Sequence, residues 1–210
     1  MGGRGSFSKS NTGAVKANQV RRTEDMIVMR GEKQAEVDQV LQVLREVSDR
    51  YGINVEQAQV AYLTPSQANV MAYYDSNGNL AVNATHFDAA KMTQAYDICT
   101  QNGFHPDRGN RTGLEAVAAH EIGHRLTDVA GERAGYGSWA ISKTSDEIIN
   151  NAMRSMGYTG SQESFRSRIS GYGAQSNHEA IAEAFSDVFC NNINARQESV
   201  AIVNALNRFF

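Results

Sequence analysis

Hydrophobic residues recur at helical spacing along much of the chain. From Gly31 to Tyr51, valines and leucines return every three or four positions with charged residues between them, and Gly52 follows as a stop signal. This pattern predicts a long amphipathic helix. Three further helices are predicted over Phe87–Gln101 with Asp88 near its start, over Asp146–Met156 behind a capping-box pattern from Thr144 to Glu147, and near Glu198–Phe210.

The middle of the chain carries shorter runs that are typical of β-strands. Val60–Leu63 and Val70–Tyr74 read as extended segments. The second run leads into Asn77-Gly78, the strongest short hairpin signal, and then into Leu80–Asn83. A β-hairpin is therefore predicted near the middle of the chain.

The segment after Thr112 predicts a buried helix. Thr112 and Glu115 match the capping box, in which each side chain bonds to the backbone of the other residue. The helix is predicted to run from about Gly113 to about Val129, and its apolar and small residues indicate burial. Together with the hairpin, these helices predict a mainly helical α+β fold with a small antiparallel sheet beside this helix.

Composition and charge place a boundary near the N-terminus. The chain has 210 residues, of which 41% are hydrophobic and 20% are charged, as in one globular catalytic domain with extensions. The net charge is −3, yet residues 1–22 hold five basic residues and no acid. We therefore predict a flexible basic arm over 1–22 and a single domain over 23–210. Only the arm is expected to suit contact with nucleic acid.

Cysteine use and hydropathy exclude several protein classes. Cys99 and Cys190 lie far apart and outside any CxxC pattern, so they suggest buried free thiols rather than a disulfide framework or a cysteine-rich zinc site. No apolar run is long enough for a membrane span, and the first residues lack the apolar segment of a signal peptide. These features predict a soluble protein that is not exported by its own signal.

The predicted helix 113–129 contains His120-Glu121-Ile122-Gly123-His124, the HExxH pattern. Two histidines four residues apart share one helix face, so both imidazoles can bind one Zn²⁺, while Glu121, rotated by about 100°, can reach water at the metal and act as general base. The alternative is a chance match with surface histidines. The apolar context of the motif disfavours it, because buried imidazoles need polar partners or a metal.

A catalytic zinc site needs a third protein ligand. Position 130, where the metzincin pattern has its third histidine, is Ala130, so a carboxylate from a second helix is the better candidate. The segment SNHEAIAEAFSD carries Glu179, Glu183 and Asp187 along one helix face. Glu179 is the expected ligand, and Glu183 is expected to accept a hydrogen bond from the free ring nitrogen of a zinc-bound histidine. Asp187 has no assigned role.

Two alternatives stay open for this segment. Ser176 and Glu179 also match a capping box, in which the Glu179 carboxylate only caps its own helix. His178 is a competing ligand, although it precedes Glu179 by one residue and so points to another side of the helix. Ligation predicts that Glu179→Gln loses zinc, whereas capping predicts only a mildly weakened fold.

The two motifs together resemble a known family. HEIGH is followed some fifty residues later by Tyr172-Gly173 and then by Glu179-Ala180-Ile181-Ala182-Glu183-Ala184-Phe185. This order is similar to that in the catalytic domain of anthrax toxin lethal factor and its relatives, which include peptidase-like domains of bacteriophage head-morphogenesis proteins. The resemblance covers about a third of the chain. The opening MGGRGS is also similar to the start of phage-encoded minor head proteins.

The resemblance implies a gluzincin-type site in a zincin-like fold. It implies that His120, His124 and Glu179 bind one zinc ion per chain. It further implies that Glu121 is the general base and that Tyr172 stabilises the oxyanion. On physical grounds alone, a phenol near the metal can donate to a tetrahedral intermediate, and the SGYGAQS setting is flexible enough to bring it there; a surface tyrosine without this role is the alternative.

The sequence therefore predicts a zinc-dependent endopeptidase that hydrolyses a protein or peptide. A phage capsid protein or a host protein is the expected substrate, and the bacterial cytoplasm or the virion is the expected location. A strand of the hairpin is expected to pair with an extended substrate, or else only to cover the helix. The main alternative is a structural module of a phage head or toxin that keeps zinc for stability. Retention of Glu121 argues against it, because a structural site needs no base.

Overall fold

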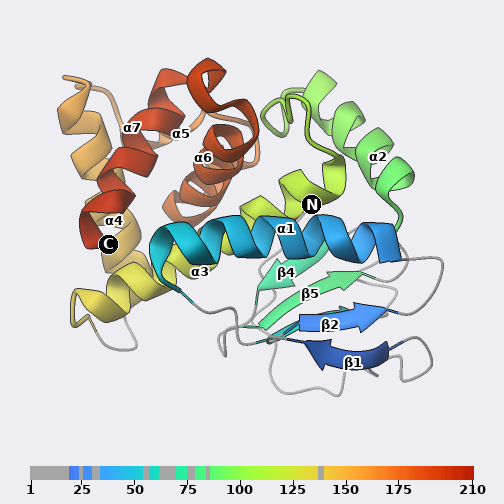
Figure 1. Ribbon diagram of the computed structural model, residues 1–210. Coiled ribbons are helices and arrows are strands. Elements are labelled where there is room, and N and C mark those ends of the chain that lie inside the picture. The colour runs from blue at the N-terminus through green and yellow to red at the C-terminus, as the bar shows by residue number, and fades with distance from the viewer. Residues whose placement is uncertain are drawn as a thin grey trace.

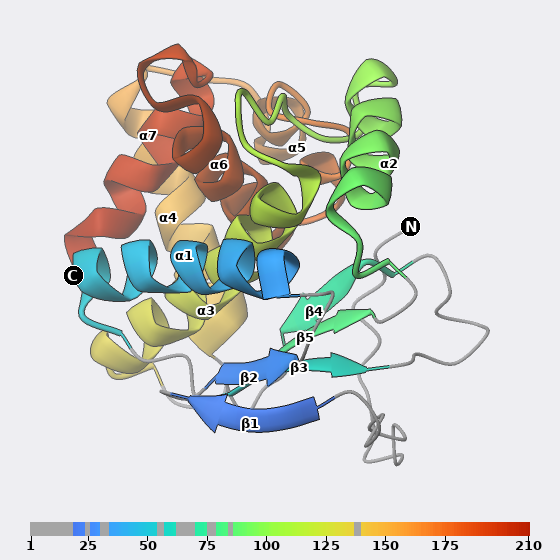
Figure 2. The ribbon, with the colours of Figure 1, turned by 45° about the vertical axis from the view of Figure 1, so that its right-hand side comes forward.

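The protein, described here by a computed structural model, places a five-stranded sheet against a group of helices (Figure 1). Helices α1 (Gln34–Tyr51) and α3 (Gly113–Arg133) lie across one face of the sheet, and most other helices gather on the side of α3 away from the sheet (Figure 2). The structure describes residues 19–23, 26–29, 34–53, 57–61, 70–74, 79–83, 86–136 and 140–210.

The sheet combines parallel and antiparallel strands in the order β1-β2-β3-β5-β4. The outer pairs β1–β2 and β4–β5 are antiparallel, whereas β2–β3 and β3–β5 are parallel. Helix α1 connects β2 to β3, and a helical crossover of this kind is what parallel neighbours require. The strands are β1 (Gln19–Thr23), β2 (Met26–Met29), β3 (Gln57–Ala61), β4 (Ala72–Tyr74) and β5 (Asn79–Asn83).

The predicted hairpin is confirmed as the antiparallel pair β4–β5, in which Ala72 faces Val82. Its predicted turn at Asn77-Gly78 lies outside the described residues. The prediction of an antiparallel sheet is wrong for the internal strands, because the α1 crossover brings β2 and β3 into parallel register. The run predicted to begin at Val60 begins at Gln57 instead.

The boundary predicted for the N-terminal arm also differs from the structure. Residues 19–22 of the predicted arm belong to β1, where Arg21 and Arg22 pair with Val28 and Ile27 of β2. Pairing with β2 satisfies backbone groups that an arm would leave to water. Residues 1–18 lie outside the described part of the chain.

Most predicted helices occur, with differences at their ends. Helix α2 (Ala89–Gln101) starts after Asp88, whose side chain caps its first turn. Helix α3 starts with the complete capping box of Thr112 and Glu115, as predicted, but runs one turn beyond Val129. The first two residues of that turn, Ala130 and Gly131, are buried, whereas Glu132 and Arg133 are exposed. The helix ends at Arg133, and Gly135 just after it has φ +72°.

Helix α4 (Ala140–Ser155) begins before its predicted start at Asp146. Thr144, expected to open the helix, is fully buried within it, and the neighbouring Ser145 donates its hydroxyl to the carbonyl of Ile141 at 2.6 Å. A hydroxyl that bonds back to the preceding turn sits in a helix interior, so the capping prediction was wrong here. The remaining helices are α5 (Gln162–Arg166), α6 (Asn177–Asn191) and α7 (Gln197–Leu206), with 3₁₀ turns at Gly173–Gln175, Asn192–Asn194 and Asn207–Phe209.

One hydrophobic cluster contains side chains from the sheet and from all seven α-helices of the described residues. Helix α3 is buried along most of its length and contacts α1, α2, α4 and α6. Burial on several sides explains why its sequence is apolar or small almost throughout. Cys99 and Cys190 are free thiols, as predicted, but each is only half-buried. Within the described residues, no helix is both long and apolar enough to cross a membrane.

Candidate metal centre

The candidate site begins on α3, which holds the HEIGH motif inside the protein. The side chains of His120 and Glu121 are buried, and the ring centroids of His120 and His124 lie 4.8 Å apart. The capping box at the start of α3 and the apolar packing around it hold this helix in place. The two imidazoles therefore face the same small volume from successive turns.

A close approach between α3 and α6 brings in the third residue. A Cβ atom at Gly123 would lie 2.8 Å from the Cα of Ala182 in α6, closer than real Cβ contacts allow. Glycine at position 123 therefore lets the two backbones meet. As a result, Oε2 of Glu179 lies 3.3 Å from Nε2 of His120 and 3.3 Å from Nε2 of His124.

These three residues form a group that could hold a metal ion. One ligand atom from each of His120, His124 and Glu179 lies within 4.8 Å of the others. Oε2 of Glu179 is buried and has no hydrogen-bond partner among the described residues. A buried carboxylate oxygen without a donor is costly unless a cation compensates it. Two imidazole nitrogens and a carboxylate oxygen suit a transition-metal ion, so the donor set fits such a group.

The charges in this group depend strongly on each other. Burial raises the pKa of Glu179, but the His124 and His120 rings outweigh it and lower that pKa far below its usual range. Burial lowers the pKa of His120, but the carboxylates of Glu179 and Glu183 outweigh it and raise that pKa well above its usual value. Without a metal, a proton on His120 thus supplies positive charge where a cation would otherwise sit.

The capping alternative for Glu179 accounts only for its backbone. Oγ of Ser176 accepts a hydrogen bond from the backbone N–H of Glu179 at 3.1 Å, so this half of the capping box forms. The carboxylate, however, lies at the two histidines. His178 is not in the metal-ligating group of the described residues; its ring stacks on His124 at 4.1 Å, and its Nε2 lies 3.9 Å from Asp128.

Glu183 lies one turn further along α6 and is almost fully buried. Its Oε1 lies 2.7 Å from Nδ1 of His120, and its Oε2 accepts a hydrogen bond from Oγ of Ser170 at 2.8 Å. Burial raises the pKa of Glu183, but the rings of His105 and His120 outweigh it and lower that pKa to about 2. Glu183 therefore lies beside the ring nitrogen of His120 from which it was expected to accept a hydrogen bond, although no hydrogen bond forms at that nitrogen among the described residues.

Tyr172 lies against the same histidine. Its ring and that of His120 are stacked with centroids 5.6 Å apart. Burial, followed by the charges of Glu179 and Glu121, raises the pKa of the Tyr172 phenol well above its usual value. The phenol therefore keeps its proton at neutral pH. The structure thus places an O–H donor beside the metal-ligating group.

A cavity of about 320 Å³ opens beside this group. His120, Glu121 and Tyr172 line it together with Ala72 of β4 and the two residues before that strand. Much of the remaining wall is apolar, from α2 and α3. Because β4 is an edge strand of the described sheet, the cavity lies between a main-chain edge and the reactive side chains.

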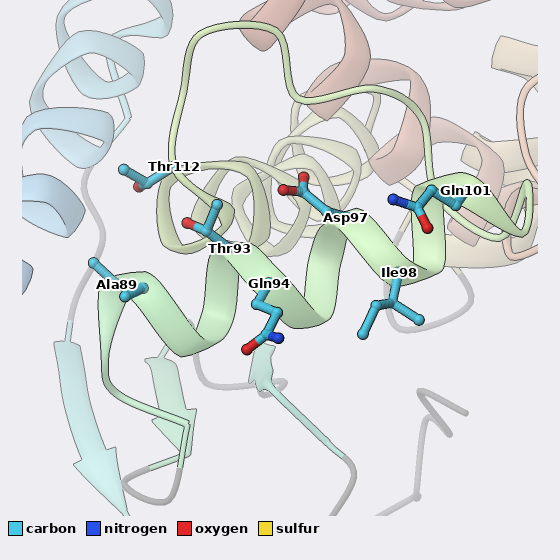
Figure 3. A pocket seen from close by; sticks show the side chains of 8 residues that line it. Ala89, Thr93, Gln94, Asp97, Ile98, Gln101 and Thr112 are labelled. Carbon is cyan, nitrogen blue, oxygen red and sulfur yellow. The ribbon is translucent and has the colours of Figure 1, made fainter.

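Two other hollows differ in what lines them. One, of about 500 Å³, borders Glu179 and is lined by polar residues that include Arg166 and Asn177. The other, of about 660 Å³, is an open hollow on the outer side of α2 (Figure 3). Its only carboxylate, Asp97, is bound by Arg108 at 2.7 Å, and no residue of the metal-ligating group lines it. The larger volume therefore does not mark the site.

The sequence patterns did not identify His105 or Ser170 as site residues. His105 lies in the loop after α2, and its Nδ1 is 3.0 and 3.1 Å from the two carboxylate oxygens of Glu183. No spacing rule connects a loop histidine with a glutamate 78 positions away. The only local feature that could have drawn attention to His105 as a site residue is its position directly before Pro106 in a loop.

Asp187, the third acid of the predicted stripe, takes no part in the metal-ligating group. Its Oδ1 accepts a hydrogen bond from Nδ2 of Asn191 at 2.8 Å, and its Oδ2 accepts one from the backbone N–H of Arg196 at 3.0 Å. Asp187 therefore closes the chain turn that follows α6.

Comparison with known proteins does not assign this site. Neither protein-family models, nor curated proteins, nor solved structures match the chain. The function is therefore inferred from the geometry and chemistry of the site.

Proposed function

We propose that the protein is a zinc-dependent endopeptidase of the gluzincin type. The observation that carries the proposal is the position of Glu179, whose Oε2 lies 3.3 Å from Nε2 of both His120 and His124. Two imidazoles and one carboxylate are a ligand set of catalytic zinc sites, which keep a fourth position open. When bound, zinc supplies Lewis acidity that polarises a carbonyl and lowers the pKa of water toward about 7.

Glu121 is the proposed proton carrier. Its carboxylate lines the cavity next to His120 and is not one of the three ligating groups. In peptide hydrolysis it accepts a proton from the attacking water and passes it to the leaving amine, as a positioned general base and acid. A site that only stabilised the fold would gain nothing from a carboxylate at this place.

Tyr172 is the proposed donor to the developing oxyanion. Its raised phenol pKa keeps the hydroxyl protonated at neutral pH, which donation requires. Strand β4, at the edge of the described sheet, is the proposed docking strand for an extended peptide, because an edge strand can accept a further strand through main-chain hydrogen bonds and β4 lies beside the cavity. Donor, base and docking strand then surround one peptide bond.

The substrate class follows from this arrangement and from the motif order. A docking strand and an open cavity suit a protein or peptide in extended form. The motif order shared with lethal factor and phage head-morphogenesis peptidase domains supports membership of that group, with a capsid or host protein as substrate. Membership of that group and the capsid or host substrate are proposed from the motif order alone.

The test uses zinc-loaded protein on a diverse peptide library, with cleavage read by mass spectrometry and metal content by elemental analysis. Glu121→Gln should keep its zinc and lose cleavage by about 10²- to 10⁴-fold. Glu132→Gln is the matched control, because Glu132 lies on the same helix and pairs with Arg125 at 3.2 Å outside the site.

Each failure points to a different alternative. A wild-type chain that holds one zinc ion and cleaves nothing would be a structural module. A chain that binds no zinc would carry a chance motif. Full cleavage by Glu121→Gln would remove the general-base assignment alone. Cleavage of the chain within its own first residues is followed in the same run.

A further inference from the structure

We propose that His105 is a positioning residue of the metal centre, which holds the Glu183 carboxylate in the orientation that directs His120. The proposal rests on the metal-binding function proposed above. Nδ1 of His105 lies 3.0 Å from Oε1 and 3.1 Å from Oε2 of Glu183, so one ring N–H spans both carboxylate oxygens. No motif of the sequence connects His105 to the site.

Glu183 needs such a partner because it is buried. Its carboxylate is 1% exposed and is contacted from three directions, by Ser170 Oγ, His105 Nδ1 and His120 Nδ1. An ionised carboxylate in the interior is stable only when donors satisfy it. His105 approaches from the loop after α2, whereas His120 approaches from α3. A carboxylate held only by Ser170 and His120 would be free to turn away from the His120 ring.

The His105 ring is itself held firmly. Its face stacks on Tyr96 of α2, with centroids 5.1 Å apart and planes 11° apart. The loop that carries it is tied to the Tyr172 segment by two backbone hydrogen bonds, from Gly171 N to Gly103 O at 2.8 Å and from Tyr172 N to Phe104 O at 3.0 Å. One loop therefore positions the histidine that holds Glu183 and supports the segment that presents Tyr172.

The consequence for the metal centre follows from His120. Its Nδ1 lies 2.7 Å from Oε1 of Glu183 and its Nε2 lies 3.3 Å from Glu179, so the two ring nitrogens face different carboxylates. A carboxylate held 2.7 Å from Nδ1 favours the tautomer that carries its proton on Nδ1 and leaves the Nε2 lone pair for a metal. Partners of this kind typically contribute about 10- to 100-fold to metal affinity.

The test compares two isosteric replacements, His105→Leu and His105→Asn. Both lose the stacked ring, but only asparagine restores an N–H donor near the position of Nδ1. Zinc affinity is measured by competition with a chromogenic chelator, and folding of the metal-free variants by thermal denaturation. We expect His105→Leu to bind zinc about 10- to 100-fold more weakly, and His105→Asn to lose less than about 10-fold.

The control is His86→Leu, because His86 lines the same cavity, whereas the groups that contact the Glu183 carboxylate in the described part of the chain are His105, His120 and Ser170. This variant should keep wild-type zinc affinity. If His105→Leu fails to fold, His105→Phe, which keeps a ring to stack on Tyr96, replaces it. Wild-type affinity in the Leu or Phe variant, or equal losses in the Leu and Asn variants, would overturn the role of the donor. Absence of zinc from the wild-type chain would instead overturn the metal site itself.

Discussion

Acidic side chains occur at both ends of α6, but they have different partners in the structure. At the N-terminal end, Glu179 and Glu183 face the histidines of α3 at 3.3 and 2.7 Å. At the C-terminal end, Asp187 accepts hydrogen bonds from Asn191 and from the backbone of Arg196. All three carboxylates lie on one helix face at four-residue spacing.

The difference lies in what stands opposite each carboxylate. The first two acids meet imidazoles because Gly123 lets α3 approach α6 at that level. The third acid lies where the chain turns from α6 into α7, so backbone and amide donors surround it instead. Helical spacing therefore predicts which residues share a face, but not which partner each of them receives.

The largest effect should come from the ligand end of α6. Glu179→Gln should lower zinc affinity by more than about 100-fold, because loss of a direct ligand should exceed the cost of losing an outer partner. Chelator competition and elemental analysis measure this loss. Asp187→Asn is the matched control on the same face and should keep one zinc ion per chain. Retention of zinc by Glu179→Gln would contradict ligation and favour the alternative that Glu179 only caps its own helix.

A smaller effect should appear when acid titrates Glu183 in the metal-free protein. Its pKa falls from 4.5 to about 2 on folding, so the unfolded chain binds its proton first as the pH drops. The resulting stability is fully present above about pH 4.5, declines between there and about pH 2, and amounts to at most about 3 kcal/mol.

Chemical denaturation of the metal-free protein at several pH values between 5 and about 2.5 should show this loss. Glu183→Gln should show a shallower decline over the same range, whatever its absolute stability. Parallel curves for wild type and Glu183→Gln would mean that other carboxylates cause the acid sensitivity.

The smallest effect should come from the far end of α6. Asp187→Asn should lower the free energy of unfolding by about 1–3 kcal/mol, because one of the two part-buried donors that the carboxylate had satisfied then faces an amide NH₂ group. Urea denaturation measures this difference, and peptide cleavage should stay unchanged. A clear loss of zinc from Asp187→Asn would show that the two ends of α6 are not independent.

Local patterns predicted the site helix well. The start of α3 at its capping box, the burial of the HEIGH motif and the antiparallel β4–β5 pair all follow from interactions among neighbouring residues. The start of α4 was predicted wrongly for a related reason. A Thr-x-x-Glu pattern caps a helix only when the preceding residues are not already helical, and around Thr144 they are.

Features that depend on contacts between distant segments were not predicted from the sequence. The parallel pairing of β2, β3 and β5 depends on where α1 places its crossover. The contact between His105 and Glu183 depends on a loop that is held by the Tyr172 segment. Neither has a periodic or motif signature, because the interacting residues are far apart in the chain.

The sequence alone determined the residue types and their local geometry: two histidines one turn apart with Glu121 between them, and acids every fourth position on a second helix. Those features depend on helical periodicity, which is a local property of the backbone. Only the tertiary structure decided that Glu179 meets both histidines, that Glu183 is shared between His120 and His105, and that Asp187 meets neither. Such pairings are set by the packing of α3, α6 and the His105 loop, which no single segment encodes.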